Sequence, residues 1–132
     1  MKIVFIDWFC FDRRETKDAL REMGHEVIEF YHEEYNESLS EGFTKAFSEI
    51  LDKNHPDMVF SYNYYPLVAI GCRDYGVTYV SFLYDNPYAF IYSYTLMFET
   101  NVVFLFDSSL VEQFRRGGLK NVYYMNLPGV PE

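Results

Sequence analysis

The sequence predicts an α/β fold: a doubly wound, Rossmann-like three-layer sandwich around a mainly parallel sheet of about six strands. Six short apolar runs alternate with helix-like segments along the 132 residues. This alternation is typical of parallel strands joined by right-handed helical crossovers. Proline or a capping residue precedes most helices, and glycine often follows them. The length suits one domain, and a hydrophobic content of 49% is enough to build its core.

The strands are the short apolar, β-prone runs. They are predicted at residues 2–8, 26–31, 57–62, 78–83, 101–106 and 122–127. The first is continuously apolar up to Asp7, as expected of a buried parallel strand. The second contains Glu26 and Glu29, so we expect it near a sheet edge.

Capping-box spacing marks the first two helices. Asp12 and Glu15 begin the first helix. Its expected inner face is Ala19, Leu20 and Met23. Ser38 and Glu41 repeat the spacing at the start of a helix predicted over residues 38–54. Apolar residues recur there at three- and four-residue steps, which predicts an inner face of Leu39, Phe43, Phe47, Ile50 and Leu51.

The later helices begin at proline or at a short polar side chain. Pro66 begins one that stops at Gly76, and Pro87 begins another that extends to about residue 97. Asp107 precedes a helix that ends at the two glycines at 117 and 118. Proline suits the first helical position because no backbone N–H is needed there.

Charge and cysteine content narrow the class of protein. The net charge is −9, which argues against nucleic-acid partners and against binding to an anionic membrane surface. No apolar run approaches the length of about 20 residues that a membrane span needs. Cys10 and Cys72 are far apart, as expected of reduced thiols in a cytoplasmic protein. No metal-ligand spacing is present, and we expect no bound metal.

The candidate site lies at the carboxyl ends of the strands, where open α/β sheets bind ligands. Tyr84, Asp85 and Asn86 follow the fourth strand and precede Pro87. The most common six-strand order would set the first strand beside the fourth. A crevice would then gather Asp7, Trp8, Tyr84 and Asp85, with Asn63 and Asp107 nearby. Asp85 and Asp7 also have a simpler explanation as partners of a helix dipole.

Cofactor chemistry is disfavoured by the turn at residues 8–12. It has no glycine, whereas dinucleotide and P-loop sites need glycine for close approach to phosphates. We therefore expect no cofactor. Aromatic rings with amides and isolated carboxylates suit a neutral polyhydroxylated ligand such as a saccharide. Any single tyrosine could equally be a packing residue, because the chain holds thirteen.

Several segments together resemble one family. They are MKIVFIDW at 1–8, GHEV at 24–27, DMVFSYNYYP at 57–66, YVSFLYDNP at 79–87, FLFD at 104–107 and GLKNVYY at 118–124. The chain resembles the N-terminal domain of CgeB-like (spore maturation protein) glycosyltransferases of the GT-B type. NYYP and YDNP carry most of the specificity, whereas GHEV is common in Rossmann-like domains.

The resemblance implies an acceptor-binding domain at residues 1–127, with an interdomain linker beginning at residues 128–132. The nucleotide-sugar donor would bind only through a C-terminal domain that is absent from this chain, so the chain alone is expected to be inactive. Asp85 and Asp7 are the candidate catalytic groups. The candidate saccharide-binding residues are Trp8, Asn63, Tyr64, Tyr84, Asn86 and Asp107. The alternative is a non-catalytic α/β binding module that forms a homodimer through exposed aromatic surface.

Overall fold

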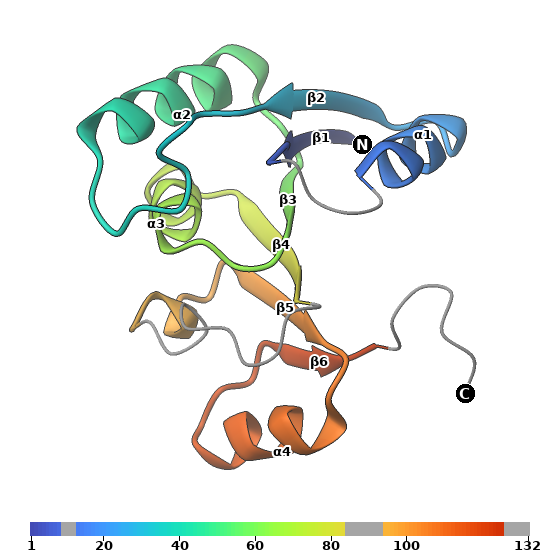
Figure 1. The fold of residues 1–132 in the computed structure, drawn as a ribbon, viewed down its shortest axis with the longest axis vertical. Helices are drawn as coiled ribbons and strands as arrows, with labels where there is room; N and C mark the ends of the chain where they lie inside the picture. Colours follow the sequence, from blue (N-terminus) through green and yellow to red (C-terminus); the bar gives the residue numbers. More distant parts are fainter. Residues whose placement is uncertain (9–12, 84–93, 126–132) are drawn as a thin grey trace.

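The structure is a computed structural model that describes residues 1–8, 13–83 and 94–125. It confirms the predicted fold class, because six parallel strands form one sheet with helices on both faces (Figure 1). In chain order the elements are β1 (Lys2–Ile6), α1 (Arg13–Glu22), β2 (Glu26–Phe30), α2 (Glu41–Asn54), β3 (Met58–Tyr62), α3 (Pro66–Tyr75), β4 (Thr78–Leu83), the 3-10 helix η2 (Tyr94–Met97), β5 (Asn101–Leu105), α4 (Ser108–Arg116) and β6 (Val122–Tyr124).

The strand order is β2-β1-β3-β4-β5-β6. The expectation that β1 lies beside β4 is therefore wrong, since β3 lies between them. Val4 of β1 pairs in register with Val59 of β3, and both side chains are fully buried. The chain reverses its direction of travel between β1 and β3, so the switch point of this sheet lies there.

One face of the sheet is covered by α2, α3 and α4. A single buried cluster joins sheet residues such as Val4, Val59 and Val103 to Phe47 of α2 and Val111 of α4. Helices α2 and α3 approach closely at Gly71, where an added Cβ would lie 2.5 Å from the Phe47 ring. This face carries the main apolar core.

A hydrogen-bonded network runs through that core. Tyr64 stacks on Tyr79 with ring centroids 5.7 Å apart, and both are fully buried. The Tyr79 hydroxyl lies 2.6 Å from Ser61 Oγ and accepts from the Tyr65 backbone N–H at 3.2 Å. Buried hydroxyls need such partners, because an unpaired one costs free energy.

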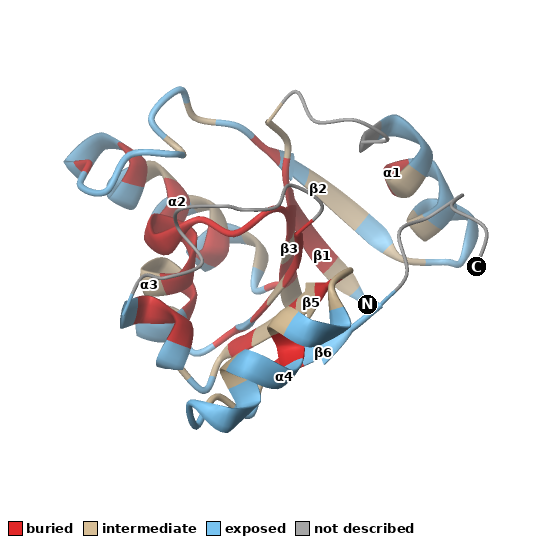
Figure 2. Ribbon diagram, turned by 60° about the horizontal axis from the view of Figure 1, so that its bottom comes forward, coloured by how far each residue is buried: buried red, intermediate tan, exposed pale blue. Residues whose placement is uncertain are grey.

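Helix α1 lies on the other face, beside β1 and β2 (Figure 2). Among the described residues, its buried cluster is small: Phe5, Tyr62 and Phe82. Helix α1 meets this face through polar groups: Thr16 shares a hydrogen bond with the Tyr62 hydroxyl, and Lys17 Nζ lies 5.7 Å from the centre of the Phe5 ring.

Two predicted helix details are wrong. Among the side chains of α1 that the structure describes, the buried one is Lys17, whereas Ala19 and Met23 are exposed, because ion pairs rather than apolar contacts hold this helix. Helix α2 begins at Glu41 and its cap is Ser40, not Ser38; Ser40 Oγ accepts from the Phe43 N–H at 3.0 Å. That later start leaves Leu39 outside the helix and 87% exposed.

A side chain of α4 forms a hydrogen bond with one outward-facing carbonyl of the edge strand β6. The backbone of Asn121 and Met125 bonds to β5, so the carbonyl of Val122 points away from the sheet. Arg115 Nε donates to this carbonyl at 3.0 Å, and the guanidinium lies over the Tyr123 ring, 5.2 Å from its centre.

Candidate functional site

Aromatic side chains gather at the carboxyl edge of the sheet, at the switch point. Trp8 follows β1, and its indole Nε1 donates to the Tyr62 carbonyl at the end of β3 at 2.8 Å. The indole stacks on Tyr35 at 6.2 Å between ring centres, with 14° between the ring planes. Tyr65 meets Trp8 edge-on at 6.0 Å, and Tyr31 lies 6.0 Å from Tyr35. We call Trp8, Tyr31, Tyr35 and Tyr65 the aromatic cluster.

The aromatic cluster extends from the core to the surface. Tyr65 is buried, Trp8 and Tyr35 are half-buried, and Tyr31 is 49% exposed. Such rings offer flat apolar faces together with hydroxyl and indole N–H groups. This combination suits a ligand with one apolar face and a hydroxylated rim.

Backbone turns hold the loop that carries Tyr35. The Tyr35 N–H donates to the His32 carbonyl at 3.1 Å, and the Glu37 N–H donates to the Glu34 carbonyl at 3.2 Å. Glu34 Oε1 accepts from Ser40 Oγ at 3.0 Å, which joins the loop to the cap of α2. The Tyr35 ring is thus positioned by both ends of its loop.

Asp7, the residue before Trp8, is held by an ion-pair network with Lys17 of α1 and Glu29 of β2. Lys17 Nζ lies 2.9 Å from Asp7 Oδ2 and 2.8 Å from Glu29 Oε1. Burial opposes the charge of Lys17, but the hydrogen bonds and negative charges of Glu29 and Asp7 outweigh it and raise the lysine pKa. The hydrogen bond from Lys17 lowers the pKa of Glu29. Asp7 is therefore fixed in position at the end of β1.

Asn63 and Tyr64 follow β3 but turn into the protein. Asn63 is 2% exposed, has a left-handed φ of 62°, and its N–H donates to the Phe82 carbonyl at 2.7 Å. The Tyr64 hydroxyl lies 2.5 Å from Thr95 Oγ1 and accepts from Asn101 Nδ2 at 3.2 Å. Burial raises the pKa of Tyr64 to about 12. The structure thus places Tyr64 in the core.

The remaining predicted site residues lie apart or outside the described residues. Asp107 Oδ1 accepts from the N–H groups of Ser109 and Leu110, so it caps α4. It follows β5, which two strands separate from β1. Tyr84, Asp85 and Asn86 are not among the described residues. Of the predicted site residues that are described, Asp7 and Trp8 lie together at the edge, and Asn63 follows the neighbouring strand.

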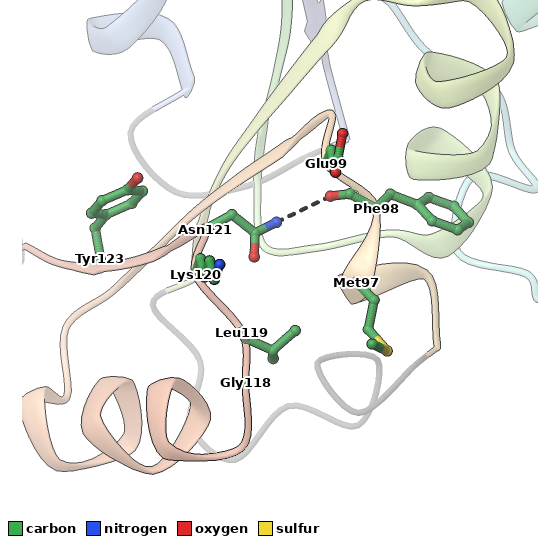
Figure 3. Close-up of a pocket in the computed structure, with 8 residues that line it drawn as sticks. All are labelled: Met97, Phe98, Glu99, Gly118, Leu119, Lys120, Asn121 and Tyr123. Carbon is green, nitrogen blue, oxygen red and sulfur yellow. Dashed lines mark hydrogen bonds between the residues drawn. The ribbon is translucent and has the colours of Figure 1, made fainter.

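A separate pocket of about 400 Å³ opens at the amino edge of the sheet (Figure 3). Its walls precede β5 and β6, and Asn121 Nδ2 joins them by donating to the Phe98 carbonyl at 3.1 Å. The residues that line it are Met97, Phe98, Glu99, Gly118, Leu119, Lys120, Asn121 and Tyr123. None of them is a residue that the sequence singled out as part of a site.

Sequence reasoning missed four residues near the switch point. Tyr31 and Tyr35 lie in or beside a segment that reads as a hydrophilic loop, and Lys17 lies in a helix with few apolar residues. Tyr65 directly follows Tyr64, and the sequence alone does not distinguish it from the neighbouring tyrosines as a site residue. A useful signal was available: two tyrosines four residues apart follow directly on the second strand, at the sheet edge where ligands bind.

No protein-family model matches the chain, and no curated protein matches it. Within the described ranges, no helix is long and apolar enough to span a membrane. The same part of the chain contains no group of three or more His, Cys, Asp or Glu side chains arranged to hold a metal ion.

Proposed function

We propose that this chain is the acceptor-binding domain of a GT-B glycosyltransferase. Such an enzyme transfers a sugar from a nucleotide-sugar donor to a saccharide or glycosylated acceptor, and this domain alone is inactive without a C-terminal donor domain. The aromatic cluster at the switch point carries the proposal. Trp8, Tyr35 and Tyr31 offer partly exposed rings at the sheet edge where α/β folds bind ligands.

Asp7 acts in this proposal by orienting the acceptor. Its ion pair with Lys17 at 2.9 Å fixes one carboxylate oxygen at the end of β1, in the residue that precedes Trp8. A carboxylate held in this way is suited to accept a hydrogen bond from a sugar hydroxyl. The sequence predicts Asp85 or Asp7 as the general base or acceptor-orienting group, and a base must lie within hydrogen-bond reach of the attacking hydroxyl.

The fluorescence of Trp8 tests the proposal directly, because it is the only tryptophan in the chain. Titration with glucose, cellobiose, glucosamine and glucuronic acid should change its emission with at least one saccharide. Tyr35→Ala should lower the affinity for that saccharide about three- to tenfold, which is the contribution expected of one ring contact. Tyr35→Phe should keep most of the affinity.

The matched control is Tyr124→Ala. The same tyrosine-to-alanine change is made there as at Tyr35, but Tyr124 lies on β6, far across the sheet. Its removal should leave the titration unchanged. An emission that no saccharide alters, or an affinity that is equal in Tyr35→Ala and the parent, would refute an acceptor site at this edge.

A second candidate is a module that associates through the sheet face on which α1 lies. Phe60, Val80 and Val102 are neighbours in register on this face and are each only half-buried. A second row runs from Phe82 through Phe104 to Tyr123, which is 41% exposed. Light scattering separates the two candidates: a dimer that Tyr123→Glu dissociates favours association through this face.

A further inference from the structure

We propose that the aromatic cluster selects saccharides that carry a protonated amino group over neutral and anionic ones. This inference rests on the proposed function and names the ligand class of the same site. It depends on the charges of the residues near the rings. The prediction of a neutral saccharide from the sequence did not take these charges into account.

The loop that positions Tyr35 is acidic. Residues 32–37 contain Glu33, Glu34 and Glu37 and neither lysine nor arginine, and all three glutamates are exposed. Glu34 is partly engaged, since it accepts from Ser40 Oγ. The turns that hold Tyr35 therefore keep three glutamates within two positions of it along the chain.

Nearby basic groups do not offset these charges. Lys17 is buried and paired with both Asp7 and Glu29. Arg14 and Arg21 belong to α1, which lies on the opposite side of the sheet from α2 (Figure 2). Arg21 is directed to Glu29, with 3.5 Å between Nη2 and Oε1. Of the described lysine and arginine side chains of α1, none is therefore placed to offset the three glutamates of residues 32–37.

Aromatic rings and carboxylates favour the same ligand charge. A cation over the face of Trp or Tyr is attracted by the ring quadrupole, with about 0.5–1 kcal/mol at exposed sites. Carboxylates within a Debye length of about 10 Å add attraction, whereas an anionic sugar meets repulsion. Together these terms predict that the amine improves affinity about three- to tenfold over a matched neutral sugar.

The test compares glucosamine, N-acetylglucosamine and glucuronic acid near neutral pH, where most of the amine is protonated. Trp8 emission gives each affinity. We expect glucosamine to bind tightest and glucuronic acid weakest. The advantage of glucosamine should shrink as salt is added, because the three glutamates are exposed.

Two double variants separate local charge from total charge. Glu33→Gln with Glu37→Gln removes two carboxylates within two positions of Tyr35 along the chain and should reduce the preference for glucosamine about threefold or more. Glu49→Gln with Asp52→Asn changes the net charge equally on exposed positions of α2 and should leave the preference intact.

The failures are distinguishable. Equal affinity for glucosamine and N-acetylglucosamine, or an unchanged preference in the Glu33/Glu37 double variant, overturns the amine selectivity while saccharide binding stands. If none of the saccharides alters Trp8 emission, the proposed function fails and the selectivity fails with it.

Discussion

The two faces of the sheet are held by different forces. Under α2, α3 and α4, aliphatic and aromatic side chains interlock in one continuous buried cluster. Under α1, three buried aromatic side chains meet a helix that contributes a lysine and a threonine. Apolar packing therefore stabilises the first face, and ion pairs with hydrogen bonds secure the second.

This difference means that the two faces should respond to different perturbations. Truncation of a buried ring removes transfer free energy and leaves a cavity, whatever the salt or pH. Loss of a charged partner leaves carboxylates without compensation, and its cost depends on solution conditions. Each prediction below tests one side of that contrast, from the largest expected effect to the smallest.

Phe47→Ala should cost about 3–5 kcal/mol of unfolding free energy, because the side chain is 1% exposed and contacts Phe30 and Phe43 at 5.5 Å between ring centres. Urea denaturation measures the loss. Leu39→Ala, at a side chain that is 87% exposed, should change stability by less than about 0.5 kcal/mol. Similar losses in both variants would contradict the central role given to the α2 face.

Alkaline pH should also weaken the α2 face. Burial raises the pKa of Tyr64 to about 12 from an ordinary 10.0, and burial also raises the pKa of Tyr79 well above its ordinary value. Above pH 10 the unfolded state loses these protons before the folded state does, so stability falls as pH rises from about 10 to 12. The ionisation of Tyr64 alone accounts for about 3 kcal/mol of this loss in the free energy of unfolding.

Urea unfolding across that pH window gives the measurement. Tyr64→Phe cannot ionise, so its stability should fall less steeply with pH than that of the parent, even though the variant is less stable at neutral pH. A slope that matches the parent would show that Tyr64 ionises as readily when folded as when unfolded. Burial of Tyr79 and the acidic partners of Lys17 raise the pKa values of these groups as well, so some slope should persist.

Lys17→Met should cost about 1–3 kcal/mol, because it leaves Asp7 and Glu29 without their shared cation. Adding Asp7→Asn to this variant should restore part of the loss. Arg116→Ala, which breaks only the exposed pair with Glu112, should cost under about 0.5 kcal/mol. A Lys17→Met protein as stable as the parent would mean that apolar contacts hold α1 after all.

The strands could be predicted from the sequence because each buried parallel strand is a short apolar run. β4 was predicted with its correct bounds, and β1, β3 and β5 within two residues at each end. The strand order could not be predicted in this way. A crossover as long as residues 31–57 can reach either neighbour of β1, and the pairing of Val4 with Val59 depends on packing between distant segments.

The site was predicted in part. Asp7 and Trp8 were identified because residues after a buried strand reach the carboxyl edge. The stacking of Tyr35 on Trp8 could not be foreseen, since it depends on turns within residues 32–37 that join segments 27 positions apart. The burial of Lys17 was missed because two acids on different strands compensate it, and hydrophobic periodicity carries no sign of such a pair.

The contact between Arg115 and Val122 has a consequence for the behaviour of the protein in concentrated solution. An outermost strand presents free carbonyls to which a stray chain can attach and start a fibril. Here one such acceptor is already occupied by a guanidinium anchored in α4. An intruding strand must first displace that cation, so this hydrogen bond should oppose strand addition at Val122.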